Sequence, residues 1–182
     1  FKDGIVYLNM KGSCAGCPSS TATLQHGIQN LLRHFVPDVQ AMRRRVEENV
    51  PETLRDRELK LGRGGLSDVE WLVQSLQLRH AGEVEDLRVT GTLPALRAIA
   101  RHGLLPEAEV AVLEEAWLLA SRIRAAVLLW TGKVGDVLPT NMRDLEAIAR
   151  LSGVGTAGGE LEERYLRVTR LARQVFEARF YR

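Results

Sequence analysis

The fold is decided by one long stretch of sequence, PEAEVAVLEEAWLLASRIRAAVLLWT, which occupies residues 106–131. Its first residue is a proline, which suits the first turn of a helix because that turn leaves its N–H groups unpaired. Apolar residues then recur every three or four positions: they are Val110, Leu113, Trp117, Ala120, Ile123, Val127 and Trp130. The stretch therefore predicts a long amphipathic helix with one face in a core.

Similar stripes predict further helices on both sides of this one. Ser67 and Glu70 form a capping box that predicts a helix from residue 67 to about residue 81. Thr92 is expected to cap the next helix, and Thr140 or Asn141 to start a short one that ends at Gly153. A last helix carries the apolar residues between positions 161 and 180. From about residue 40 onward the chain is therefore predicted to be a helical bundle.

Residues 40–49 are predicted to form a basic helix that leads into this bundle. Its apolar face would carry Val39, Met42 and Val46. Arg43, Arg44 and Arg45 favour a solvated face over an anion site, because charge runs on helices usually face water.

The first part of the chain has a different texture. Alternating residues predict a strand at positions 5–10, and a loop at positions 12–18 leads into a helix at positions 19–35. The predicted fold is therefore mostly α, a helical bundle preceded by a strand–loop–helix fragment. The domain boundary falls between residues 1–39 and residues 40–182.

Composition excludes several classes of protein. The chain has 182 residues, of which 45% are hydrophobic and 26% charged, so it can bury a core. A net charge of +2 argues against nucleic-acid binding, which usually needs a dense basic patch. The longest apolar run, at residues 125–130, is too short to span a membrane. Two cysteines and no secretory signal predict a cytoplasmic protein.

Those two cysteines, Cys14 and Cys17, carry the sharpest chemical signal. Two thiolates at this spacing can hold one soft metal or one edge of a cluster. The same spacing also occurs in redox dithiols and by chance. A dithiol of the thioredoxin type would follow a parallel strand in a βαβ unit, and no such unit is found around residue 14.

The wider string around the cysteines, GSCAGCPSS at residues 12–20, resembles the C-terminal domain of NifU-like iron–sulfur scaffold and carrier proteins. The resemblance runs from about residue 1 to residue 39 and covers about half of such a domain. It implies that Cys14 and Cys17 bind a [4Fe–4S] cluster shared with the same cysteines of a second copy. Self-association through this segment is therefore expected.

A second motif, LKLGRGGLSDVEW, lies at residues 59–71. Its glycines predict a turn that leads into a helix, and it lacks the third glycine of a dinucleotide-binding fingerprint. Acidic side chains at Asp68 and Glu70 suit the positive end of a helix dipole and would repel a phosphate.

This motif and the helices after it resemble glutamine synthetase adenylyltransferase, the bacterial enzyme that attaches AMP to glutamine synthetase and removes it. The match covers about residues 40–182, the helical domain that follows a nucleotidyltransferase domain. The resemblance implies a loop that faces the active site; its candidate residues are Lys60, Gly62, Arg63, Gly64, Gly65, Asp68 and Glu70. Glutamine synthetase or the missing nucleotidyltransferase domain is the implied partner.

Catalytic residues are not found in the sequence. That family holds Mg²⁺ and ATP with spaced aspartates after a Gly-Ser pair, and the only such pair here, Gly12-Ser13, leads into a cysteine. We therefore expect that the isolated chain transfers no nucleotide. The chain is interpreted as a hybrid or fragment, with an iron–sulfur carrier as the alternative interpretation.

Overall fold

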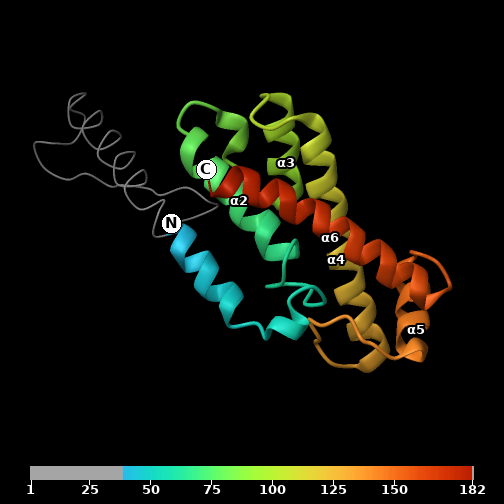
Figure 1. The fold of residues 1–182 in the computed structure, drawn as a ribbon. Helices are drawn as coiled ribbons and strands as arrows, with labels where there is room; N and C mark the ends of the chain where they lie inside the picture. Colours follow the sequence, from blue (N-terminus) through green and yellow to red (C-terminus); the bar gives the residue numbers. More distant parts are fainter. Residues whose placement is uncertain (1–38, 182) are drawn as a thin grey trace, which may run out of the picture.

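The computed structural model describes residues 39–181, and these residues form a bundle of helices (Figure 1). A helix over residues 39–48 comes first and carries no label in Figure 1. The labelled elements follow in this order: η2 (Glu52–Leu54), α2 (Leu66–His80), η3 (Glu85–Leu87), α3 (Thr92–Arg101), α4 (Glu107–Thr131), α5 (Met142–Ser152) and α6 (Gly158–Phe180). The predicted strand–loop–helix fragment lies outside the described residues.

Helix α4 is the centre of the bundle, because it packs against α2, α3, α5 and α6. The predicted stripe faces the core as far as Val127, and Leu113, Ala120 and Ile123 are fully buried. Trp130 was expected on the same face, but 41% of it is exposed and its Nε1 donates to Asp144 Oδ1 at 2.8 Å. The last turn of α4 extends beyond the core, where neighbouring residues such as Leu129 are also exposed.

Helix α6 closes one side of the bundle. Figure 1 shows it running diagonally across α2 and α4 towards α5, and it packs against all three. Leu161, Tyr165, Ala172 and Phe176 lie on its buried face, which matches the predicted apolar stripe. Burying a side chain the size of Leu161 or Phe176 stabilises the fold by about 1.5–3 kcal/mol.

The helix over residues 39–48 packs with a face that agrees only in part with the predicted one. Val39 and Val46 are partly buried as predicted, but Met42 is 56% exposed, whereas Arg43 and Glu47 are buried. The prediction that Arg43 faces solvent is therefore wrong. Opposite charges elsewhere in the fold compensate the buried arginine, and periodicity alone does not reveal partners that lie far away in sequence.

The start of α2 also differs from the prediction. The N-cap residue is Gly65, Ser67 lies inside the first turn, and no side chain caps the helix. Backbone carbonyls replace the predicted capping box, because Ser67 N donates to Lys60 O at 2.8 Å. The loop before α2 thus folds back and satisfies N–H groups that a helix start normally leaves unpaired.

Two other predicted caps can be compared by mutation. Asn141 caps α5, because its side chain accepts a hydrogen bond from Asp144 N at 2.9 Å. Thr92 is the first residue of α3, after the N-cap Gly91, and makes no capping hydrogen bond. Asn141→Ala should therefore lower the free energy of unfolding by about 1 kcal/mol, while Thr92→Ala should change it by less than about 0.5 kcal/mol. Urea denaturation of both variants measures the difference, and equal losses would contradict the assignment.

Between residues 39 and 181, no helix combines the length and the apolar character that crossing a bilayer requires.

Candidate functional site

The glycine loop, residues 59–65, is packed against the protein's own backbone. A Cβ atom at Gly62 would lie 2.2 Å from Glu58 O, and one at Gly65 would lie 2.8 Å from Leu59 O. Gly64 has a φ of +68°, and its Cβ would lie 1.9 Å from Thr169 O in α6. Close packing inside the fold therefore requires glycine at these three positions, because neighbouring backbone atoms already occupy the space beside them.

Glu58 holds the loop from its N-terminal side. Its Oε2 accepts hydrogen bonds from Leu61 N and from Gly62 N, the latter at 2.6 Å. Burial raises the pKa of Glu58 above its ordinary value, although these backbone donors oppose the shift. Tyr165 in α6 donates its hydroxyl to Glu58 O at 3.2 Å, and burial raises the pKa of that hydroxyl.

A second segment braces the residues before the loop. Leu59 N donates to Asp136 O at 2.6 Å, and Leu138 N donates to Arg57 O at 2.9 Å. These bonds flank an antiparallel bridge between Glu58 and Val137. The loop between α4 and α5 thus fixes the direction in which the chain enters the glycine loop.

Behind the loop lies a charge cluster that consists of Arg43, Glu47, Asp68 and Arg173. Asp68 is fully buried at its centre. Its Oδ1 accepts from Arg43 Nη2 at 2.5 Å, and its Oδ2 accepts from Gly64 N at 2.7 Å and from Arg173 Nη1 at 3.1 Å. Burial raises the pKa of the Asp68 carboxyl, and the two arginines oppose that shift. Asp68 thereby joins three separate segments of the chain.

Glu47 completes the charge cluster on the side of the helix over residues 39–48. It accepts from Arg173 Nη1 at 2.7 Å and from Arg63 Nε at 3.3 Å. Burial by itself would raise the pKa of Glu47, but Arg173, Arg63 and Arg43 outweigh burial and lower it. Arg173 also donates to Glu177 at 2.7 Å. Burial lowers the pKa of Arg173, and these acidic partners more than reverse that effect.

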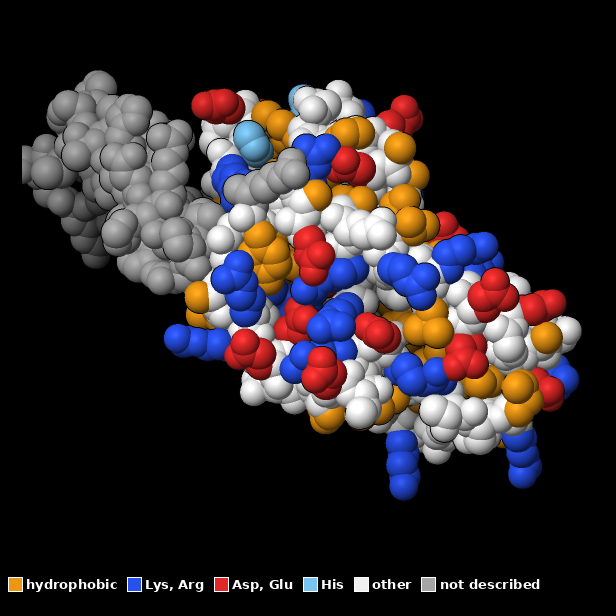
Figure 2. All heavy atoms as spheres, in the orientation of Figure 1, with side chains coloured by type: hydrophobic (Ala, Val, Ile, Leu, Met, Phe, Trp, Pro, Cys, Tyr) orange, Lys and Arg blue, Asp and Glu red, His pale blue; other side chains and the backbone are white. Residues whose placement is uncertain are grey.

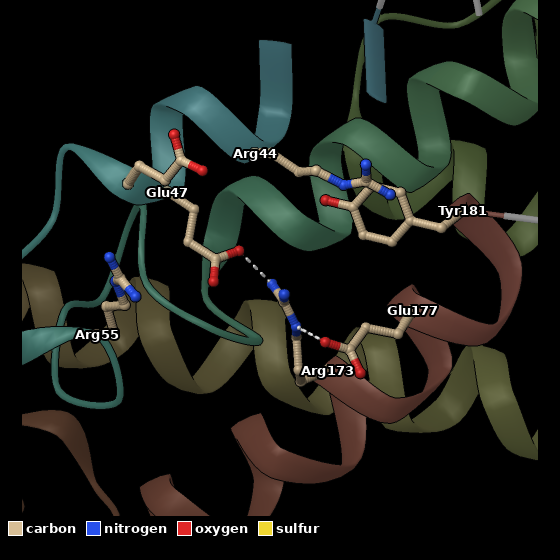
Figure 3. Close-up of a pocket in the computed structure, with 7 residues that line it drawn as sticks. Arg44, Glu47, Arg55, Arg173, Glu177 and Tyr181 are labelled. Carbon is tan, nitrogen blue, oxygen red and sulfur yellow. Dashed lines mark hydrogen bonds and ion pairs between the residues drawn. The ribbon is translucent and has the colours of Figure 1, made fainter. Parts of the chain in front are cut away.

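Two open cavities flank Arg173. One has a volume of about 490 Å³ and is shown in Figure 3, where Arg173 rises from α6 towards Glu47 and Arg44 lies against the ring of Tyr181. The guanidinium carbon of Arg44 is 4.6 Å from the centre of that ring, a distance typical of a cation–π contact. The other cavity, of about 480 Å³, is lined by Arg63 and Arg170 among others. Figure 2 shows basic and acidic side chains interleaved on this face.

The structure separates the residues predicted to face an active site. Lys60 is exposed and Arg63 is partly exposed, whereas the three glycines and Asp68 are buried. Glu70 is half-buried, accepts a hydrogen bond from Trp117 Nε1 at 3.3 Å, and lines a different cavity from Arg63. The sequence motif is therefore mainly an internal structural element with two outward cations.

Metal ligands of the usual kind do not gather in the described part of the chain. Between residues 39 and 181, no group of three or more His, Cys, Asp or Glu side chains could hold a metal ion. Cys14 and Cys17, the predicted metal ligands, lie outside the described residues.

Sequence reasoning missed Arg43, Glu47 and Arg173. One signal was present, because Arg43 and Glu47 are four residues apart and so lie on the same face of a helix. That spacing is common on solvated helices, so it does not by itself indicate burial.

Comparison with known proteins identifies the helical part of the chain. A family model described as GlnD PII-uridylyltransferase matches residues 40–180, which include the charge cluster and the glycine loop. The chain belongs to this family. A second family model, the NifU-like domain, matches residues 1–43, which include both cysteines.

Three curated relatives of this GlnD-type chain carry the name bifunctional glutamine synthetase adenylyltransferase/adenylyl-removing enzyme. The protein of Streptomyces avermitilis is 50% identical over 123 residues, which are 67% of this chain and 12% of the relative. That of Leifsonia xyli is 46% identical over 149 residues, which are 80% of this chain and 15% of the relative. That of Mycobacterium avium is 54% identical over 117 residues, or 64% and 12%. The chain thus spans a small part of the length of these relatives.

Proposed function

We propose that residues 40–180 serve as the helical, non-catalytic domain of a glutamine synthetase adenylyltransferase. The observation that carries this proposal is the match of the GlnD-type family model across the helical bundle, supported by relatives about 50% identical. In this role the domain presents its glycine loop to a nucleotidyltransferase domain that binds ATP and Mg²⁺ and modifies glutamine synthetase. We further propose that the protein acts in the cytoplasm, because its two cysteines are few enough to suit a reducing compartment.

The geometry of the loop supports a docking role and not a chemical one. Asp68 is surrounded by partners inside the protein, so it is not available as a ligand for Mg²⁺. The side chains of Lys60 and Arg63 reach the surface. Fixed cations on a rigid loop suit contact with a negatively charged surface, such as a catalytic domain loaded with a nucleotide.

The test is reconstitution of nucleotide transfer from two parts. The chain is mixed with the Streptomyces avermitilis relative from which the matched segment has been removed, and AMP transfer from labelled ATP to glutamine synthetase is measured. We expect no transfer by the chain alone and restored transfer by the mixture. A Lys60→Glu/Arg63→Glu variant should reduce the restored rate about tenfold or more, while Lys133→Glu, an exposed charge outside the loop, should not.

Two results would refute the proposal. One is transfer of AMP by the chain alone, which would place the chemistry in this chain. The other is a mixture no more active than the truncated relative, although both parts are folded.

A second candidate function belongs to the segment before the bundle. We propose that Cys14 and Cys17 bind a [4Fe–4S] cluster shared between two copies, and the NifU-like match over residues 1–43 supports it. Anaerobic reconstitution with iron and sulfide should give a brown dimer whose colour is lost in the Cys14→Ser/Cys17→Ser variant. A colourless monomer would refute this function.

A further inference from the structure

The helix over residues 39–48 is attached to the bundle by polar side chains. Gln40 Nε2 donates to Phe180 O at 2.6 Å, and Arg43 Nη2 donates to Asp68 and to Leu61 O, the latter at 3.1 Å. Glu47 binds Arg173 of α6. The helices α2 to α6, in contrast, pack on one another through a continuous apolar core. The position of this first helix therefore depends on directional hydrogen bonds and charges in addition to the contact of Val39 with the apolar core.

Arg43 is held less completely than a buried arginine usually is. Its side chain is fully buried, yet its Nε and Nη1 atoms find no acceptor among residues 39–181. A buried N–H donor without a partner raises the free energy of the conformation in which it is buried. Movement of the first helix would expose the unpaired donors of Arg43 to water.

Asp68 accepts three hydrogen bonds from inside the protein. One carboxylate oxygen faces Arg43, and the other faces Gly64 N and Arg173. Asp68 Oδ2 pairs with Arg173 of α6, and the same oxygen holds Gly64, the residue with positive φ in the glycine loop. Arg43 thus contacts the glycine loop directly at Leu61 O, and it also reaches Gly64 N through the Asp68 carboxylate.

We propose that Asp68 is a positioning residue through which Arg43 couples the helix over residues 39–48 to the glycine loop. When this helix is docked, Asp68 holds Gly64 N and the loop is ordered. When the helix moves away, the Asp68 carboxylate rotates towards Arg173, its remaining charged partner. The glycine loop then becomes less ordered. Any effect of this coupling on the docking of a catalytic domain rests on the proposed function, whereas the coupling itself is a property of this chain.

Amide hydrogen exchange of the full chain, measured by NMR, tests the coupling. The variant is Arg43→Met, which removes the charge and keeps much of the buried length. We expect exchange at Gly64 N to rise about tenfold or more, while amides in α5, such as that of Ile148, stay within about twofold. Arg45→Met is the matched control, because Arg45 is an exposed arginine on the same helix.

Two outcomes would overturn the proposal. One is exchange at Gly64 that rises no more in Arg43→Met than in Arg45→Met. The other is a rise of equal size at Gly64 and Ile148, which would mean loss of global stability without local coupling. If Arg43→Met does not fold, Arg43→Lys applies the same test in milder form, because it keeps the charge but loses the planar guanidinium whose Nη2 reaches both Leu61 O and Asp68 Oδ1.

This experiment uses no nucleotide and no catalytic domain. Failure of the coupling would therefore leave the proposed function intact. Conversely, failed reconstitution of AMP transfer would leave the exchange result at Gly64 unaffected.

Discussion

Gly64→Ala is expected to lower the free energy of unfolding by about 4 kcal/mol or more, and so to leave little folded protein. Two independent effects add at this position. The φ of +68° disfavours any side chain, and the new Cβ would lie 1.9 Å from the backbone oxygen of Thr169 and 2.9 Å from its Cα. Because the obstacle is the backbone of α6, it cannot rotate away. Circular dichroism during urea denaturation measures the loss.

Gly103→Ala is the matched control for this prediction. Gly103 has a similar φ of +65°, but a Cβ atom added there would have nothing within 4 Å of it. Gly103→Ala should therefore lower the free energy of unfolding only by the conformational cost of a positive φ, about 1–2 kcal/mol. Equal losses in the two variants would show that contact with α6 contributes nothing and would contradict the packing described for the glycine loop.

Asp68→Ala should destabilise the protein by about 3–5 kcal/mol, because it leaves Arg43 buried without its counter-charge. The fully buried pair of Arg43 and Asp68 is joined at 2.5 Å, and Arg173 loses one of its partners as well. The substitution also removes the acceptor of Gly64 N. Thermal and urea denaturation near neutral pH measure the change.

Asp68→Asn and Asp86→Ala are the comparisons for this variant. Asparagine keeps an acceptor for Gly64 N while removing the charge, so its loss should be intermediate. Asp86 is 53% exposed in its ion pairs with Arg101 and His102, and removing it should have no measurable effect on the midpoint. A midpoint of Asp68→Ala equal to that of Asp86→Ala would mean that the charge cluster does not stabilise the fold.

Much of the fold could be predicted from local patterns. The stripe from Val110 to Val127 correctly gave the buried face of α4, and Asn141 and Gly153 correctly bounded α5. These predictions succeeded because a helix start, its buried face and its end depend on residues within a few turns of one another. The prediction that Trp130 faces the core was wrong, because the length of an apolar stripe does not show where the neighbouring helices end.

The candidate site could be predicted only in part. The motif at residues 59–71 correctly located a turn before a helix, and its resemblance indicated the family that the comparison then identified. The roles of its residues were not predictable. Ser67 was expected to cap α2, but Gly65 is the N-cap and the carbonyl of Lys60 accepts from Ser67 N, because the loop folds back on itself.

The sequence by itself determined that this protein has amphipathic helices, where most of them begin and end, and which glycine-rich turn precedes α2. Only the tertiary structure decided what the charges do. Asp68 meets Arg173 across 105 positions in sequence, and Glu47 meets the same arginine across 126. An arginine on a helix is expected to be solvated unless an opposite charge is brought to it, and only the packing of α6 against the first helix and the glycine loop does so.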